Sequence, residues 1–103
     1  GVLGKDLNVE EGYDAARQCA ISLLAQLKSA VNGDLNKVTK VVKLGGFVNS
    51  APDFTEQPSV INGASDLLVE LLGEKGRHAR TAVGANLPLG VAVEIDGIFE
   101  VES

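Results

Sequence analysis

The chain has 103 residues, 45% of them hydrophobic and 22% charged, which fits one globular domain spanning 1–103. Its net charge is −5, and the acidic surplus lies after Pro52, where nine Asp or Glu residues outnumber three Lys or Arg residues. Because such a chain repels phosphate backbones, nucleic acid is not expected as a partner.

The cysteine and histidine counts exclude several kinds of site. Cys19 is the single cysteine, so no intrachain disulfide forms, and its place in an apolar helical stripe favours a buried small side chain over a nucleophile. The single histidine, His78, excludes the usual multi-histidine metal sites. No run of about 18 apolar residues is present to span a membrane, and no signal peptide opens the chain. We therefore expect a cytoplasmic protein with no membrane partner.

The first predicted element is a long amphipathic helix. Asn8 and Glu11 have the spacing of a capping box, in which each side chain bonds the other residue's backbone amide. Apolar residues then recur at helical spacing as far as Val31. Asn32-Gly33 predicts the end of the helix, with glycine in the left-handed conformation.

A β-branched stretch from Val38 to Asn49 predicts a strand. The pair Gly45-Gly46 lies within it, which indicates a bulge or the close approach of another backbone, with a simple bend and a ligand-facing segment about equally favoured. Strict alternation puts Val42, Leu44 and Val48 on one face and Val41, Lys43 and Phe47 on the other.

The second half of the chain predicts a helix and two strands. Helical spacing of apolar residues indicates a helix from about Ser59 to Leu72, closed by Gly73 and Gly76. A short strand from Arg80 to Val83 and a turn at Leu87-Pro88-Leu89-Gly90 follow. The stretch from Val91 to Val101 alternates strictly and predicts a final strand, with Val91, Val93, Ile95, Gly97, Phe99 and Val101 on one face.

This order of elements predicts an α+β fold, a two-layer sandwich with both helices on one face of a mixed sheet. A sheet of three strands is too narrow to bury the apolar faces of two amphipathic helices. We therefore expect either that N-terminal strands are missing from this chain or that another chain covers the remaining apolar surface. The strands carry apolar groups on both faces, which predicts that the chain is not a stable monomer.

Few residues could carry chemistry, because Ser-His-Asp, Cys-His, phosphate-loop and metal-ligand motifs are all absent. Arg80 could hold a carboxylate in a bidentate fork, although a surface ion pair is favoured from sequence alone. Glu94 could orient a water, although the alternation favours a plain solvent-facing side chain. For Asn62, helix capping or exposure is the favoured interpretation.

The C-terminal part of the chain resembles the Rid family, the YjgF-type reactive intermediate imine deaminases also called endoribonuclease L-PSP. The resemblance rests on Ala79-Arg80-Thr81-Ala82-Val83, then Leu87-Pro88, then Val93-Glu94-Ile95-Asp96. Segments 10–27, 38–48 and 53–62 resemble the first helix, the central strand and the loop with the second helix of that family, in the right order.

The resemblance implies a chorismate-mutase-like homotrimer with ligand clefts between subunits. In deaminating members an arginine, here Arg80, holds the carboxylate of a 2-aminoacrylate-type enamine or imine, and a backbone amide, here Ala82, supports it. The family's water-positioning glutamate corresponds to Glu94, and an asparagine near its second helix corresponds to Asn62. Water attacks the imine, and ammonia and a 2-keto acid are released. No metal or organic cofactor is needed.

Two other functions stay open under the same resemblance. A trimer could bind a small carboxylate through Arg80 without turnover. Ribonuclease activity, known for some members, is disfavoured by the acidic charge and by the absence of a histidine pair.

The sequence also departs from the family pattern, which indicates a sister subgroup. The six residues from Thr81 to Asn86 make the arginine-to-Leu-Pro spacing one residue shorter than usual, which could shift the strand register. His78 stands where many members have proline, and the segment 54–62 is longer than usual. The N-terminal strands of the family, which contribute residues to the cleft, are absent from this chain.

Overall fold

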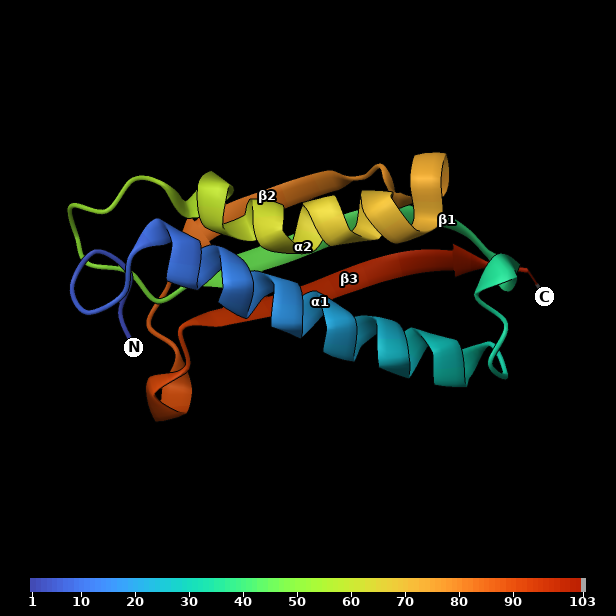
Figure 1. Cartoon of the computed structure of the whole chain (residues 1–103), viewed down its shortest axis with the longest axis horizontal. Coiled ribbons are helices and arrows are strands. Elements are labelled where there is room, and N and C mark those ends of the chain that lie inside the picture. Colours follow the sequence, from blue (N-terminus) through green and yellow to red (C-terminus); the bar gives the residue numbers. More distant parts are fainter. Residues whose placement is uncertain (103) are drawn as a thin grey trace.

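The computed structural model describes residues 1–102 and shows two layers, with both helices on one face of a three-stranded sheet (Figure 1). Strand β1 is central, pairing in parallel with β2 and antiparallel with β3. The predicted α+β sandwich is therefore confirmed. The elements are α1 (Val9–Ala30), β1 (Val38–Val48), α2 (Gln57–Leu72), β2 (Ala79–Gly84) and β3 (Val93–Val101), with short 3-10 turns at Leu35–Lys37, Gly73–Gly76 and Pro88–Gly90.

Helix α1 begins and ends where the sequence predicts. The Glu11 amide donates to Asn8 Oδ1 at 2.9 Å, and the Asn8 amide donates to Glu11 Oε1 at 3.0 Å, so the capping box is complete. At the other end, Asn32 and Gly33 both adopt left-handed backbone conformations, with φ values of 55° and 85°. These residues turn the chain out of the helix and towards β1.

Helix α2 begins at Gln57, two residues before the predicted start. Pro58 lies in its first turn, where a backbone N–H would have no helical partner, so proline is tolerated there. Asn62 consequently lies in the second turn of the helix. The helix ends at Gly73, as predicted, with a φ of 63°.

The two helices approach each other closely at Gly63. A Cβ atom on Gly63 would overlap the backbone carbonyl of Tyr13, so only glycine fits at this crossing. Two polar contacts flank it: Tyr13 Oη donates to Asp66 at 2.8 Å, and Arg17 Nη1 lies 3.3 Å from Glu70 Oε2. The crossing brings both helices within reach of one narrow sheet.

The faces of β1 differ from the strict alternation that the sequence suggests. Val41 is fully buried with Leu44 and Val48, whereas Val42 is 38% exposed, so the assignment of Val41 and Val42 was wrong. The β1–β3 register shifts between Val41 and Lys43. Such an irregularity reverses the order in which side chains face the core.

The glycine pair in β1 makes room for neighbouring side chains, and not for the backbone that the sequence suggested. A side chain on Gly46 would overlap Ile61 of α2, and one on Gly45 would overlap the Asp96 carboxylate of β3. The strand runs through both glycines without interruption, and the register shifts lie before them. The bend and the bulge predicted at the glycines are therefore not found.

Strand β3 alternates as predicted, although it begins at Val93 and not at Val91, because the turn at Pro88–Gly90 leads directly into Val91. Val93 and Ile95 pack into the core, while Glu94 is exposed. The sheet face away from the helices carries apolar side chains as expected: Val42 is 38%, Val83 40% and Ile98 60% exposed.

The segment before α1 is anchored beside the sheet. Leu3 is fully buried, its amide donates to the Asn49 carbonyl at 2.8 Å, and its carbonyl accepts from the Ala51 amide at 2.9 Å. Neither helix in residues 1–102 has the length and apolar character needed to cross a membrane.

Replacing Gly63 with alanine is expected to lower the free energy of unfolding by about 2 kcal/mol, because the new methyl group must push the Tyr13 carbonyl away. Helix propensity alone would favour alanine by about 1 kcal/mol, so a net loss of stability would show that the close contact between the helices opposes the substitution. Urea denaturation measures the change, with Ser22→Ala on exposed α1 surface as the control. A more stable Gly63→Ala protein would contradict the close packing.

Candidate functional site

Arg80 lies on β2, on the face of the sheet that the helices cover. It stands opposite Leu44 of β1, a fully buried residue, but β2 is at the edge of the sheet and the Arg80 side chain is exposed. Its Nη1 donates to Ser65 Oγ on α2, at 3.0 Å. The guanidinium group is thus held against the helix with most of its N–H groups still free to bind.

Ser65 also contacts His78. Ser65 Oγ lies 3.0 Å from His78 Nε2, and His78 Nδ1 lies 2.5 Å from the backbone carbonyl of Gly76. Because that carbonyl can only accept, Nδ1 carries a proton, and in this tautomer of the imidazole Nε2 accepts from the Ser65 hydroxyl. The hydroxyl oxygen in turn accepts from Arg80, so every bond in this chain of four groups has a donor and an acceptor.

These residues surround a cavity of about 280 Å³. It brings together two of the predicted site residues, Arg80 and Asn62. Ala82, two residues after Arg80 on β2, has its side chain on the same covered face and is half-buried against the core. The cavity is lined by Asn62, Ser65, Val69, Arg77, His78 and Arg80.

Arg80 does not form the surface ion pair that the sequence favoured. Within residues 1–102 the ion pairs are Arg17–Glu70 and Arg77–Glu74, the second at 3.2 Å on exposed surface. Arg80 therefore lines the cavity without a carboxylate partner in the described part of the chain.

Glu94 lies apart from Arg80. It is on β3, at the other edge of the sheet, two strand spacings or about 10 Å away across the sheet. It pairs with Phe47 and faces away from the helices, whereas Arg80 is on the covered face. A separate cavity of about 260 Å³, between α1 and β3, includes Glu94 and Cys19 in its lining. One copy of the chain does not join the two residues.

Cys19 is half-buried, which supports its interpretation as a small core side chain. Its Sγ lies 3.6 Å from the Val93 carbonyl. Burial of the thiol, and secondarily the Glu94 carboxylate, raise the pKa of Cys19 above its usual value. The thiol is therefore a poor nucleophile at neutral pH.

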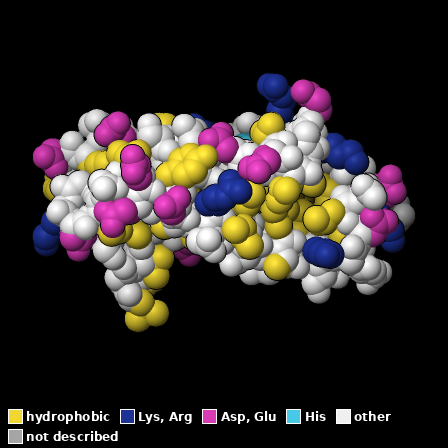
Figure 2. Space-filling view, in the orientation of Figure 1, with side chains coloured by type: hydrophobic (Ala, Val, Ile, Leu, Met, Phe, Trp, Pro, Cys, Tyr) yellow, Lys and Arg dark blue, Asp and Glu magenta, His cyan; other side chains and the backbone are white. Residues whose placement is uncertain are grey.

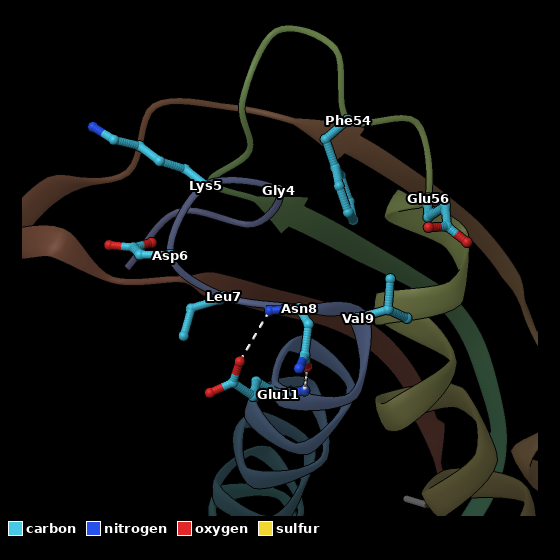
Figure 3. Close-up of a pocket in the computed structure, with 9 residues that line it drawn as sticks. All are labelled: Gly4, Lys5, Asp6, Leu7, Asn8, Val9, Glu11, Phe54 and Glu56. Atoms are coloured by element: carbon cyan, nitrogen blue, oxygen red, sulfur yellow. Dashed lines mark hydrogen bonds between the residues drawn. The ribbon is translucent and has the colours of Figure 1, made fainter.

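Three larger hollows contain none of the predicted site residues: one of about 350 Å³ beside Ser50 and Asn86, and two that are larger still. One, of about 530 Å³, lies between the loop before α1 and the loop before α2, with Phe54 pointing into it and Glu11 bound to Asn8 at its floor (Figure 3). The other, also about 530 Å³, lies on the uncovered face of the sheet around Gly45 and Asp96. Within residues 1–102 no cluster of three or more His, Cys, Asp or Glu residues could hold a metal ion.

Comparison with known proteins identifies the family. The family described as "YjgF/chorismate_mutase-like, putative endoribonuclease" matches residues 1–94. The chain belongs to this family. The expected fold is thereby confirmed as YjgF-like and chorismate-mutase-like.

Relatives of this YjgF-family chain are similar over its whole length. Protein TCP17 of Trypanosoma cruzi is 54% identical over 105 residues, covering 100% of this chain and 65% of the relative. The crystal structure of Atu1372 from Agrobacterium tumefaciens is 53% identical with a TM-score of 0.98, covering 100% of this chain and 66% of that one. A structure titled "a putative endoribonuclease" from Shewanella oneidensis is 37% identical with a TM-score of 0.93, over 98% of this chain and 67% of that one. The chain thus spans about two thirds of these relatives.

The shortened spacing after Arg80 does not shift the register of β2 against β1. The β1–β2 register runs without a shift from Lys43 opposite Ala79 to Val48 opposite Gly84. The six-residue spacing therefore ends in the loop after β2, and Arg80 lies on the covered face of the sheet.

Sequence reasoning missed Ser65 as a site residue. Ser65 lies three residues after Asn62, so the two share one face of α2, and this spacing could have indicated it. His78 was noted as the single histidine and as a departure from the family's proline, but not as a site residue. The turn at Gly73–Gly76, which brings His78 back to α2, has no strong sequence signature.

The raised pKa of Cys19 predicts slow alkylation by iodoacetamide at pH 8, because little thiolate is present. In Glu94→Gln the charge that helps to raise this pKa is removed, so the pH profile of alkylation should move to lower pH. We expect a gain of about twofold to threefold in rate at pH 8, smaller than the effect of burial.

The matched control is Glu100→Gln, on the same exposed face of β3 but not among the groups that raise the Cys19 pKa. An unchanged alkylation profile in Glu94→Gln, or an equal change in both variants, would show that the Glu94 charge does not reach the thiol.

Proposed function

We propose that the protein hydrolyses small enamine and imine intermediates of the 2-aminoacrylate type to 2-keto acids and ammonia, in a cleft between subunits. The observation that carries the proposal is Arg80, a cation without a carboxylate partner in the described chain, facing a small cavity beside Asn62. Such a guanidinium is suited to a small carboxylate ligand.

Substrate binding would use the free side of the guanidinium. The bond to Ser65 occupies one of its N–H groups, leaving others for a bidentate grip on a carboxylate. The cavity volume of about 280 Å³ suits a molecule of a few heavy atoms, such as 2-aminoacrylate. The Ala82 backbone amide and the Asn62 side chain would add polar contacts.

The reaction needs a water held at the imine carbon. The enamine first tautomerises to the imine, and water then adds across the C=N bond to give a carbinolamine. Loss of ammonia from that intermediate forms the keto group. Glu94 would accept the proton of the attacking water and return it to the departing nitrogen. Fixing the carboxylate and the water together supplies most of the rate gain, and no organic cofactor is required.

Glu94 would come from a neighbouring copy. Within one chain it is on the opposite face and opposite edge of the sheet from Arg80. A homotrimer whose clefts form between subunits would pair Arg80 of one copy with Glu94 of the next. The apolar side chains of Val42, Val83 and Ile98 on the uncovered face supply area for such contacts.

The projecting loop after β2 also favours association. The turn at Pro88–Gly90 extends from the body of the molecule, and its tip is hydrophobic (Figures 1 and 2). Leu89 at this tip is fully exposed and adopts a φ of 60°, an unfavourable backbone conformation for leucine. A leucine in this position is typical of a contact with another chain.

A second candidate function is binding of a small carboxylate without turnover, which Arg80 alone could support. Ribonuclease, the activity in the family's description, is less favoured. The net charge of −5 opposes RNA binding, and His78 is the single histidine available for acid–base catalysis.

The direct test measures ammonia and 2-keto acid from enzymatically generated 2-aminoacrylate, using the full-length protein. Arg80→Ala should lose at least about a hundredfold of the acceleration, because the carboxylate anchor is gone. Lys75→Ala, an exposed cation in the neighbouring turn, should keep the rate. Carboxylate binding without any ammonia release would favour the non-catalytic trimer.

The inter-subunit cleft is tested by mixing two inactive variants, Arg80→Ala and Glu94→Gln, after unfolding and refolding them together. If Arg80 and Glu94 act across a subunit boundary, about one quarter of the clefts in random trimers regain both native residues, and activity returns to that extent. If both residues act from one chain, mixing restores nothing. Sedimentation should show an assembly at micromolar concentration, and a monomer there would refute the trimer.

A further inference from the structure

In imine hydrolysis Ser65 serves only to hold Arg80, and its contact with His78 has no role there. Ser65 Oγ lies 3.0 Å from His78 Nε2, within the distance at which a histidine can take a serine proton. The Gly76 carbonyl, 2.5 Å from Nδ1, orients the ring and fixes the tautomer with the lone pair on Nε2. Nucleophile, base and orienting group are thus arranged as in serine hydrolases, with a backbone carbonyl as the third member.

The local fold fixes this pair. Gly76 is buried directly against α2, where a side chain would overlap the Leu68 carbonyl. The 3-10 turn at Gly73–Gly76 therefore lies close under the helix, and His78 leaves it facing Ser65, one turn before Leu68. Both side chains are half-buried, which limits the orientations they can adopt.

Arg80 supplies positive charge beside Ser65. It donates to Ser65 Oγ at 3.0 Å, so its positive charge stabilises negative charge that develops on this oxygen. A carbonyl group placed over Ser65 would also have its oxygen near the guanidinium, which could then stabilise the oxyanion of a tetrahedral intermediate. Asn62, one turn earlier on α2, lines the same cavity and carries an amide donor.

We propose that Ser65 is a catalytic nucleophile, activated by His78, that accepts the acyl group of a small carboxylic ester. Ser65 Oγ bonds to the ester carbonyl carbon as His78 Nε2 takes the hydroxyl proton, and the C–O bond to the alcohol breaks as His78 returns that proton to the leaving oxygen. Water then attacks the acyl-serine, again losing its proton to His78, and the carboxylic acid leaves as Ser65 is reprotonated. The cavity of about 280 Å³ restricts the acyl group to a short one.

The test treats the full-length protein with p-nitrophenyl acetate and follows p-nitrophenolate release together with the intact mass. The native protein should show a burst of nitrophenolate and one added acetyl group, which peptide mapping places on Ser65. Ser65→Ala should lose the burst, and His78→Gln should slow acylation by about a hundredfold or more. Ser29→Ala, an exposed serine at the end of α1, is the matched control and should acylate normally.

Ser65→Cys keeps a nucleophile at the same place and should still acylate at residue 65, which separates loss of the nucleophile from loss of folding. Acetylation on lysines or the N-terminus alone, or an equal burst in Ser65→Ala, would overturn the proposal. The acylation assay contains no imine, so a negative result there would not argue against the proposed deamination. Likewise, a lack of deamination would not argue against acylation of Ser65.

Discussion

The close approach of α1 and α2 is the constraint on which the rest of the molecule depends. In a sheet of three strands, the two outer strands are only about 10 Å apart. The axes of two packed helices are usually separated by about the same distance. Both helices cover so narrow a sheet only because glycine stands at the crossing, where Gly63 touches the Tyr13 carbonyl. This packing holds α2 beside the β2 edge, and Arg80 can therefore reach Ser65. The candidate site is thus a consequence of helix spacing as much as of its own side chains.

Elements with strong local patterns could be predicted from the sequence. The Asn8–Glu11 capping box and the alternation of β3 each depend on residues close in sequence, and both are found. The faces of β1 around Val41 and Val42 could not be predicted, because a register shift depends on the partner strand and breaks the period of two. The start of α2 was misplaced because Pro58, which normally signals a break, is compatible with a first helical turn.

The candidate site was predictable only in part. Asn62 and Arg80 do share a cavity, but Glu94 does not, since the strand order β2-β1-β3 puts Arg80 and Glu94 on opposite edges. Sequence order carries no direct information on that arrangement. The contact of Ser65 with His78 depends on a buried glycine turn that folds back under α2, and only three-dimensional packing reveals it. The histidine that departs from the family pattern therefore has a definite partner in this fold.

The acidic side chains of β3 limit how the sheet can grow. Glu94, Asp96 and Glu100 project from one face of this edge strand, and within the chain Glu100 stands opposite Lys40 of β1. If two copies paired antiparallel along β3, their carboxylates would be brought alongside one another with no lysine between them. Like charges facing each other across strands are unfavourable, and charged edge strands resist sheet-to-sheet aggregation in this way. The three carboxylates of β3 therefore disfavour antiparallel pairing of two copies along this strand.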